Sequence, residues 1–115
     1  MNNFYTKILI LFTACFCFLS QVYAAEILQV SSSSVLLIGD NNRTYTVKIA
    51  CTEISPDLEE KSVIWLKKQL PRHTKVNLKP KGSLDGMLVA KVIPFNSNND
   101  ITEKYIKEGF ATNNC

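Results

Sequence analysis

The chain has 115 residues, 20% of them charged, and a formal net charge of +3 at pH 7. This length leaves room for one ordinary domain. The charge balance is too weak either to demand a polyanionic partner or to exclude one. A single histidine and the lack of a Cys-x-x-Cys pair argue against a zinc site.

The first 24 residues have the pattern of a secretory signal peptide. Lys7 is their only charge, and a broadly apolar run follows over residues 8–19. Val22-Tyr23-Ala24 then places small residues at the −3 and −1 positions of a cleavage site. We therefore expect cleavage between Ala24 and Ala25 and an exported mature domain over residues 25–115. Its compartment would be a periplasm, the extracellular space or an equivalent lumen.

Two alternatives to cleavage stay open at this stage. The segment could be retained as a membrane anchor, although its apolar run is shorter than the about 20 residues that a membrane-spanning helix needs. Lipid attachment at Cys15 is the second alternative, with Phe12 where such sites prefer an aliphatic residue. We expect no membrane span once the segment is removed.

Three strands are predicted before the first helix. Residues 26–30 and 35–38 are short β-forming runs, separated by a polar break of four serines at residues 31–34. Gly39-Asp40-Asn41-Asn42 consists of residues that tolerate left-handed backbone, which is typical of a turn. Residues 43–52 alternate apolar and polar side chains, as a half-buried strand does. Together they predict a three-stranded meander.

The predicted first helix begins at Ser55-Pro56 and ends at Pro71. Either Ser55 or Asp57 is expected to cap it, and Asp57 with Glu60 fits a capping box. Apolar residues recur at helical spacing and predict a face turned to the core. They are Val63, Leu66 and Leu70, with Ile64 and Trp65 beside them.

The second half of the chain predicts two more strands and a second helix. Residues 74–78 alternate as a fourth strand, residues 80–86 are expected to be a loop, and residues 87–95 form a fifth strand. The second helix opens at Asp100 or Thr102 and ends at Gly109. Its inward-facing residues are predicted to be Ile101, Tyr105 and Ile106.

The order of three strands, a helix and two strands is that of an OB-fold. This fold is a five-stranded Greek-key barrel with a helix between the third and fourth strands. The residue pattern predicts the five strands and two helices of an α+β domain. Closure into a barrel comes from a family resemblance described below.

Cys51 and Cys115 are the two cysteines of the expected mature chain, and we predict that they form a disulfide. An exposed free thiol does not persist in an oxidising compartment. A domain of this size is also marginal on core burial alone. The chain-entropy model gives about 4 kcal/mol for closing a loop of this length. The alternative is a buried free thiol at Cys51 and a loose one at Cys115.

Three stretches resemble the staphylococcal nuclease-like (thermonuclease) family. V-K-I-A-C-T-E-I-S-P-D at residues 47–57 resembles the family's V-R-L-x-x-I-D-x-P-E, with one extra residue before the proline. D-G-M-L-V-A at residues 85–90 resembles its Y-G-R-x-L-A strand. Residues 100–111 resemble its V-N-x-x-L-V-x-x-G-L-A helix. The order and spacing match over residues 26–112. The resemblance implies a closed OB-fold barrel of that family's type and Ca²⁺-assisted phosphodiester hydrolysis.

The resemblance also implies a set of site residues, from which this chain departs. The family's metal-binding aspartate falls on Glu53, and its catalytic glutamate falls on Asp57. Its first arginine falls on Lys48, which keeps the charge but loses the bidentate fork. Its second arginine falls on Met87, which cannot bind a phosphate. Its other metal-binding aspartate falls in the serine turn, residues 31–34, whose hydroxyls are poor ligands for a hard cation.

We therefore expect that the fold is kept, that nuclease chemistry is lost or nearly so, and that no cofactor is needed. Loss of one preorganised donor costs about 10²–10³ in rate, and several losses compound without being additive. The first interpretation is an exported binding module for a nucleic acid strand, a protein or another ligand. One alternative is a weak Ca²⁺-dependent phosphodiesterase acting on DNA or RNA through Glu53, Asp57 and Lys48. The other is a structural subunit of an extracytoplasmic assembly.

Two weaker features of the sequence bear on ligand binding and catalysis. Four lysines are predicted on the fourth and fifth strands, where exposed aromatic residues beside them would suit single-stranded nucleic acid. They are Lys75, Lys79, Lys81 and Lys91. The aromatic residues Trp65, Phe95 and Phe110 mostly fall at core-like positions, so a solvated lysine face is the preferred interpretation. His73 is expected on a surface loop, and no serine lies in a nucleophile elbow.

Overall fold

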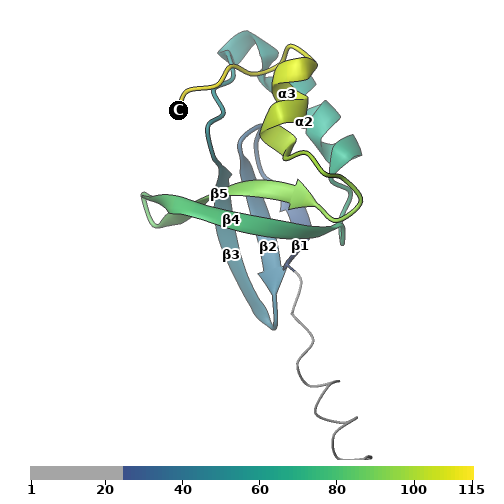
Figure 1. The fold of residues 1–115 in the computed structure, drawn as a ribbon, viewed down its shortest axis with the longest axis vertical. Coiled ribbons are helices and arrows are strands. Elements are labelled where there is room, and N and C mark those ends of the chain that lie inside the picture. Colours follow the sequence, from purple (N-terminus) through teal and green to yellow (C-terminus); the bar gives the residue numbers. More distant parts are fainter. Residues whose placement is uncertain (1–24) are drawn as a thin grey trace, which may run out of the picture.

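A computed structural model describes residues 25–115, so the predicted signal peptide and Cys15 lie outside the described residues. Five strands form a closed barrel in the order β1-β2-β3-β5-β4. β3 and β5 pair in parallel, and every other neighbouring pair is antiparallel. The strands are β1 (Ala25–Val30), β2 (Val35–Asp40), β3 (Arg43–Ile49), β4 (Lys75–Leu84) and β5 (Met87–Pro94). This is an OB-fold-like barrel, so the predicted α+β fold class is confirmed (Figure 1).

The helices lie together at one end of the barrel (Figure 1). A short 3-10 helix, η1 (Pro56–Leu58), leads into α2 (Glu59–Gln69), and α3 is Ile101–Lys107. Neither α2 nor α3 has the length and apolar character of a membrane-crossing helix, and no other helix of the described chain has them. The predicted position of the first helix between the third and fourth strands is confirmed.

The core lies inside the barrel and continues under the helices. Strand side chains alternate between the two faces, so buried residues alternate with more exposed ones at the start of β1, in the first part of β2 and at the end of β3. The fully buried members from these strands and α2 are Ile27, Leu36, Ile38, Val47, Ile49, Leu66 and Leu70. From α3, Ile101 and Tyr105 are also fully buried, as predicted, whereas Ile106 is 39% exposed and its predicted inward position is wrong.

Aromatic rings join α2, α3 and the segment after α3. The ring centroids of Trp65 and Tyr105 lie 4.8 Å apart, and those of Trp65 and Phe110 lie 5.6 Å apart. The core-like positions predicted for Trp65 and Phe110 are therefore confirmed. This cluster closes the helical end of the barrel with packing that suits aromatic pairs.

The start of the first helix differs from the prediction. Pro56 begins a 3-10 turn in which the Leu58 backbone N donates to the Ser55 carbonyl over 2.9 Å. The α-helix therefore begins only at Glu59, and neither Ser55 nor Asp57 caps it with a side chain. The capping box between Asp57 and Glu60 is wrong because the proline inserts this turn between the predicted cap and the helix. The prediction for α3 is confirmed, since the Asp100 carboxylate accepts from the Glu103 backbone N over 2.8 Å.

Two strand boundaries also differ. β3 ends at Ile49 rather than at residue 52, because Cys51 has a left-handed backbone (φ 60°) that the strand ladder does not accommodate. β4 continues to Leu84 through a bulge between Pro80 and Gly82, so the loop predicted at residues 80–86 is wrong. Asp85 and Gly86 both have positive φ and form the two-residue turn of a β4–β5 hairpin.

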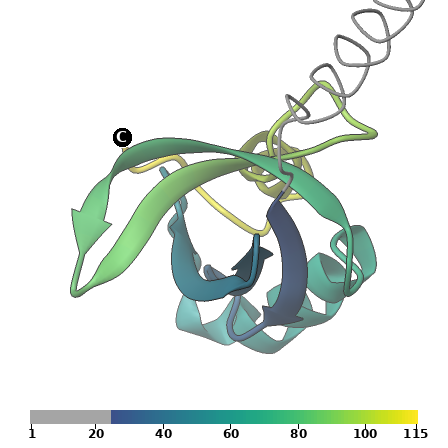
Figure 2. The ribbon, with the colours of Figure 1, turned by 90° about the horizontal axis from the view of Figure 1, so that it is seen from below.

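The β4–β5 hairpin crosses over the other three strands (Figures 1 and 2). Seen from below, it arches above the curved sheet of β1, β2 and β3, and its tip projects beyond the barrel. Its pairing with β1 is limited to two residue pairs and its pairing with β3 to three. One side of the hairpin therefore closes the barrel, and the other side faces away from it.

Candidate functional site

The serine turn between β1 and β2 is closed by two helices. Ser33, 4% exposed, donates its backbone N–H to Glu59 Oε1 over 3.1 Å and its hydroxyl to Glu59 Oε2. Its carbonyl accepts the Tyr105 hydroxyl over 2.6 Å. The polar groups of Ser33 are thus satisfied from α2 and α3. The turn in which the family resemblance places a metal-binding aspartate is occupied here by a protein hydrogen-bond network.

No local pattern in the sequence marks Glu59 or the Tyr105 hydroxyl as a partner of Ser33. Glu59 lies 26 residues after Ser33, and Tyr105 lies 72 residues after it. Glu59 is also one of two acidic residues in the first turn of α2, where the helix dipole alone would favour it. Burial and the Glu59 charge raise the pKa of the Tyr105 hydroxyl, with burial the larger cause. The phenol therefore stays neutral and able to donate at ordinary pH.

Lys48 and Met87 lie on the same outer face of the barrel. Lys48 pairs with Val89 of β5, and Met87 is two residues before Val89 on the same strand. Strand alternation turns all three side chains away from the core, whose residues on β3 are Val47 and Ile49. The structure therefore brings together the two positions at which the resemblance implies arginines, and they offer one ammonium group.

The predicted carboxylates do not join this pair in a metal-binding set. Glu53 has an exposed side chain, and its backbone pairs with Thr112 through hydrogen bonds of 3.0 and 2.9 Å. Asp57 lies exposed in η1. Within residues 25–115, no group of three or more His, Cys, Asp or Glu side chains is arranged to hold a metal ion.

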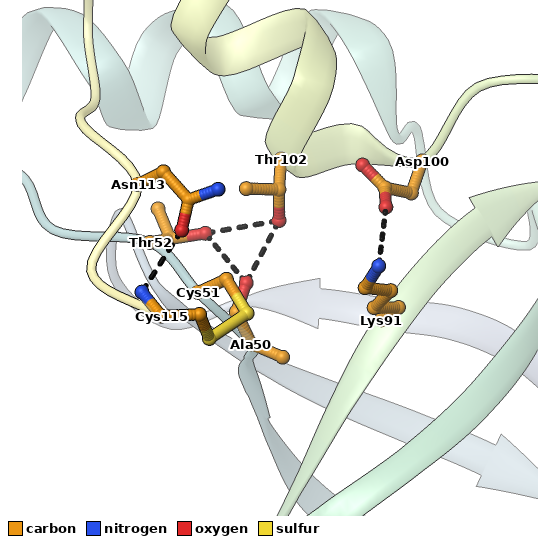
Figure 3. The surroundings of a disulfide bond; sticks show 8 residues. All are labelled: Ala50, Cys51, Thr52, Lys91, Asp100, Thr102, Asn113 and Cys115. Carbon is orange, nitrogen blue, oxygen red and sulfur yellow. Dashed lines mark hydrogen bonds and ion pairs between the residues drawn. A yellow bond between two sulfur atoms is a disulfide. The ribbon is translucent and has the colours of Figure 1, made fainter.

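A disulfide joins Cys51 and Cys115, whose Cα atoms are 5.0 Å apart, as predicted (Figure 3). The segment before Cys115 runs beside the exit of β3, through the Glu53–Thr112 bridge and a 3.4 Å hydrogen bond from the Asn114 backbone N to the Cys51 carbonyl. The bond therefore holds the last residues of the chain against the strand that carries Lys48.

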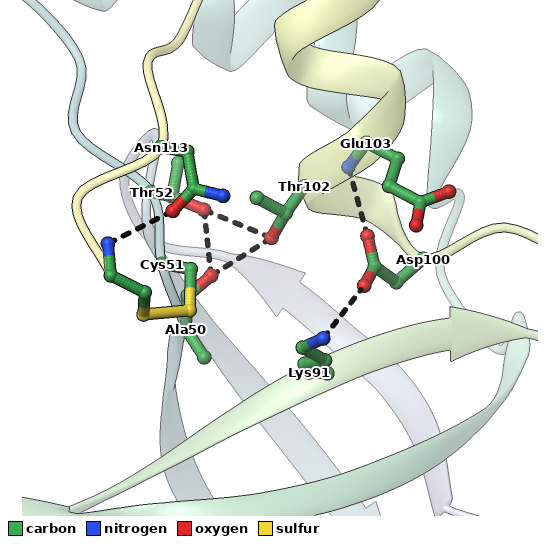
Figure 4. A network of polar contacts seen from close by, with 9 residues as sticks. Ala50, Cys51, Thr52, Lys91, Asp100, Thr102, Glu103 and Asn113 are labelled. Atoms are coloured by element: carbon green, nitrogen blue, oxygen red, sulfur yellow. Dashed lines mark hydrogen bonds and ion pairs between the residues drawn. A yellow bond between two sulfur atoms is a disulfide. The ribbon is translucent and has the colours of Figure 1, made fainter.

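Two buried threonines support the same strand exit from inside (Figure 4). The Thr52 and Thr102 hydroxyls both donate to the Ala50 carbonyl, over 3.0 and 2.9 Å, and their oxygens are 3.0 Å apart. Thr102 belongs to α3, so this contact fixes α3 on the end of β3. The exit of β3 is held both by these hydroxyls and by the disulfide.

A small hollow lies between Lys48 and the disulfide. It has a volume of about 180 Å³ and is lined by Lys48, Leu84, Val89, the two bonded cysteines and their neighbours Ile49, Thr52 and Asn114. The lining holds one cationic side chain and no carboxylate side chain. The lining therefore offers no side-chain carboxylate to Ca²⁺.

The outward side of the β4–β5 hairpin carries three of the lysines singled out in the sequence. Lys79 and Lys91 lie directly opposite each other in the strand register, and the exposed Lys81 occupies the bulge. Lys91 Nζ is 3.9 Å from Asp100 Oδ2 (Figures 3 and 4). Phe95, predicted at a core-like position, is 55% exposed instead. It is the first residue after β5 and follows the buried Pro94, and its backbone N donates to the Lys75 carbonyl over 3.1 Å.

The fourth lysine, Lys75, is paired with a carboxylate. Its Nζ is 3.0 Å from Glu26 Oε2, and His73 Nδ1 is 3.4 Å from Glu26 Oε1. These hydrogen bonds lower the pKa of the Glu26 carboxyl, with Lys75 the larger cause. The exposed position predicted for His73 is confirmed. Lys75 is therefore less available to an anionic ligand than Lys79 and Lys81, for which no ion pair is found within residues 25–115.

Comparison of the sequence with protein-family models and with curated proteins found no match.

Proposed function

We propose that this chain is an exported staphylococcal nuclease-like domain that binds a ligand and does not hydrolyse nucleic acid efficiently. The observation that carries the proposal is the network around Ser33. The turn in which a nuclease of this family would bind Ca²⁺ has no carboxylate of its own, and the nearby Glu59 accepts two hydrogen bonds from Ser33. A metal bound there would have to compete with those hydrogen bonds for the same oxygens.

The cationic groups support the same proposal. Phosphodiester hydrolysis builds negative charge on the phosphate, which planar guanidinium groups neutralise bidentately. The mature chain has two arginines, Arg43 and Arg72. Arg43 pairs with Asp40 at the far end of β3, about 16 Å along the strand from Lys48, and Arg72 lies in the segment between α2 and β4. Lys48 alone therefore faces the position where two arginines would be needed.

The proposal is tested by incubating purified, oxidised residues 25–115 with labelled single-stranded DNA and RNA, in excess Ca²⁺ or in chelator. Circular dichroism and a cooperative melt establish that the sample is folded. We expect intact substrate in both conditions. Ca²⁺-dependent cleavage that chelator abolishes and Glu53→Ala removes would overturn the proposal in favour of the weak phosphodiesterase. Cleavage that Glu53→Ala leaves unchanged would point to a contaminating nuclease, which a second purification route would remove.

A further inference from the structure

We propose that single-stranded nucleic acid binds along the outward side of the β4–β5 hairpin, an inference that rests on the binding function proposed above. We call this surface the hairpin face and define it by Asn77, Lys79, Lys81, Lys91, Ile93 and Phe95. Its lysines contact phosphates, and its exposed phenyl ring stacks on a base. Pairing of such charges with an aromatic platform is how proteins bind unpaired strands without sequence preference.

The register places these residues in rows along one side of the hairpin. Asn77 pairs with Ile93 and Lys79 pairs with Lys91. Directly opposite residues of an antiparallel pair project to the same side of the sheet. Inward-facing Leu78, Val92 and Pro94 alternate with them and contribute to the barrel interior. The Phe95 backbone N donates to the Lys75 carbonyl over 3.1 Å, which continues the ladder to the aromatic residue.

The charges of the hairpin face are poorly compensated by the protein. No ion pair within residues 25–115 involves Lys79 or Lys81, and Lys91 is 3.9 Å from its one carboxylate partner, Asp100. Like charges directly opposite each other destabilise a sheet, and Lys79 and Lys91 are such a pair. A phosphate lying between the two ammonium groups would remove this repulsion, so the arrangement favours a polyanionic ligand.

Phe95 distinguishes the hairpin face from a merely solvated lysine surface. Phe95 is 55% exposed at the end of the row, so its ring is accessible to a ligand. Unpaired bases offer their flat faces for stacking, whereas bases in a duplex are already stacked on each other. An exposed ring at one end of a cationic row therefore fits a single strand better than a duplex.

The dimensions of the hairpin suit the same ligand. β5 has 8 residues and is about 26 Å long. A strand of this length can contact several nucleotides of an unpaired chain, and OB-folds cover about 4–16 nucleotides. The hairpin arches away from β1, β2 and β3 (Figure 2), so those strands leave its outward side open.

The test measures binding of a labelled oligothymidine of about 12 nucleotides to oxidised residues 25–115 by fluorescence anisotropy, over a range of salt concentrations. Lys79→Ala with Lys81→Ala is expected to weaken binding and to reduce the slope of log affinity against log salt by about 0.7 per lysine. Phe95→Ala is expected to weaken binding about 5- to 150-fold and to leave the slope unchanged.

Matched controls come from α2, on the helical end of the molecule. Lys67→Ala with Lys68→Ala removes the same charge from two exposed lysines, and Ile64→Ala truncates an apolar side chain that is 57% exposed. Both controls should bind as the parent protein does. A loss in the α2 lysine variant equal to that of the hairpin variant would overturn the inference, because binding would then follow net charge alone.

Two further outcomes separate this inference from the proposed function. Vesicles of anionic phospholipid serve as a second probe, since lysines beside an exposed ring also suit a membrane surface. Binding to vesicles but not to oligothymidine, lost in the hairpin variants, would overturn the nucleic acid ligand and leave the binding function intact. No binding to either probe would also overturn the inference. Ca²⁺-dependent cleavage would overturn the proposed function. Oligothymidine binding by the hairpin variants would still show whether the hairpin face is the binding surface.

Discussion

The Tyr105 hydroxyl donates a 2.6 Å hydrogen bond to the Ser33 carbonyl, and it joins α3 to the turn between β1 and β2. Tyr105 is fully buried, and its ring packs on Trp65 of α2. Glu59 reaches the same serine from α2. One buried turn residue therefore holds both helices on the barrel, in the place where a nuclease of the resembled family would need a metal ligand.

Tyr105→Phe is expected to destabilise the fold by about 1–3 kcal/mol, because it leaves the buried Ser33 carbonyl without its donor. The measurement is the free energy of unfolding from denaturant titration. Tyr45→Phe is the matched control, since its hydroxyl makes one longer contact of 3.4 Å to Asp40 in a partly exposed position. Equal losses in the two variants would contradict a special role for the Ser33 contact.

Glu59→Ala should cost about 1–3 kcal/mol of folding stability, because the Ser33 N–H and hydroxyl both lose their acceptor. Glu60→Ala removes the same charge from the same first turn of α2 at an exposed position, so it controls for the helix dipole. Thermal and denaturant melts of both variants measure the difference. If Glu60→Ala were as destabilising as Glu59→Ala, the Ser33 network would not be the cause.

Replacing Cys51 and Cys115 with serine is expected to lower the free energy of unfolding by about 2–4 kcal/mol, because the unfolded chain loses a cross-link between residues 64 positions apart. The reduced parent protein should have the same melting temperature as the double variant, and the oxidised parent protein should have a higher one. A thiol assay under denaturing conditions checks the redox state of each sample. If the oxidised parent protein had the same melting temperature as the double variant, the disulfide would constrain only the end of the chain and not the stability of the fold.

Some of these features follow from the sequence by local rules, and others do not. Cys51 and Cys115 pair because the expected mature chain offers no other thiol, and Asp100 caps α3 because its side chain reaches a backbone N–H three residues on. The Asp85-Gly86 turn also had a local signal, a dipeptide typical of two-residue hairpins. The nearby Pro80 and lysines made the segment resemble a loop.

Tertiary contacts explain what the sequence pattern missed. The acceptor for Ser33 comes from a helix 26 residues away, and no local pattern marks Glu59 as different from Glu60. The sequence predicts a core-like position for Phe95, whereas the residue lies just after the end of β5 and is 55% exposed. The candidate site is less predictable than the barrel because it depends on which elements meet. The strands follow from alternation that the chain carries locally, whereas closure into a barrel is implied by the family resemblance and not by the residue pattern.

Glu26 gives the structure a defined response to acid. Its pKa is held below the ordinary value of 4.5 by hydrogen bonds, first from Lys75 and then from His73. A carboxyl whose folded pKa is lowered contributes stability above its unfolded pKa, and that contribution is lost as pH falls through the folded pKa. In an NMR titration, Lys75→Ala should move the Glu26 pKa upward towards 4.5. His73→Ala should raise the Glu26 pKa less, and Lys79→Ala, on the same strand as Lys75, should leave it unchanged. A larger rise in His73→Ala than in Lys75→Ala would contradict Lys75 as the main cause.

Ser62 is a buried polar residue of α2. Its side chain is fully buried in α2, and its hydroxyl has no hydrogen-bond partner within residues 25–115. Ser62→Ala removes an unsatisfied polar group and improves helix propensity, so we expect the free energy of unfolding to rise by about 1 kcal/mol. Thr102→Ser is the contrasting variant, because it keeps the hydroxyl that donates to the Ala50 carbonyl and loses only a buried methyl, at a cost of about 1 kcal/mol. Denaturant titration measures both. Destabilisation by Ser62→Ala would contradict an unsatisfied hydroxyl and would point to a buried water bound to it.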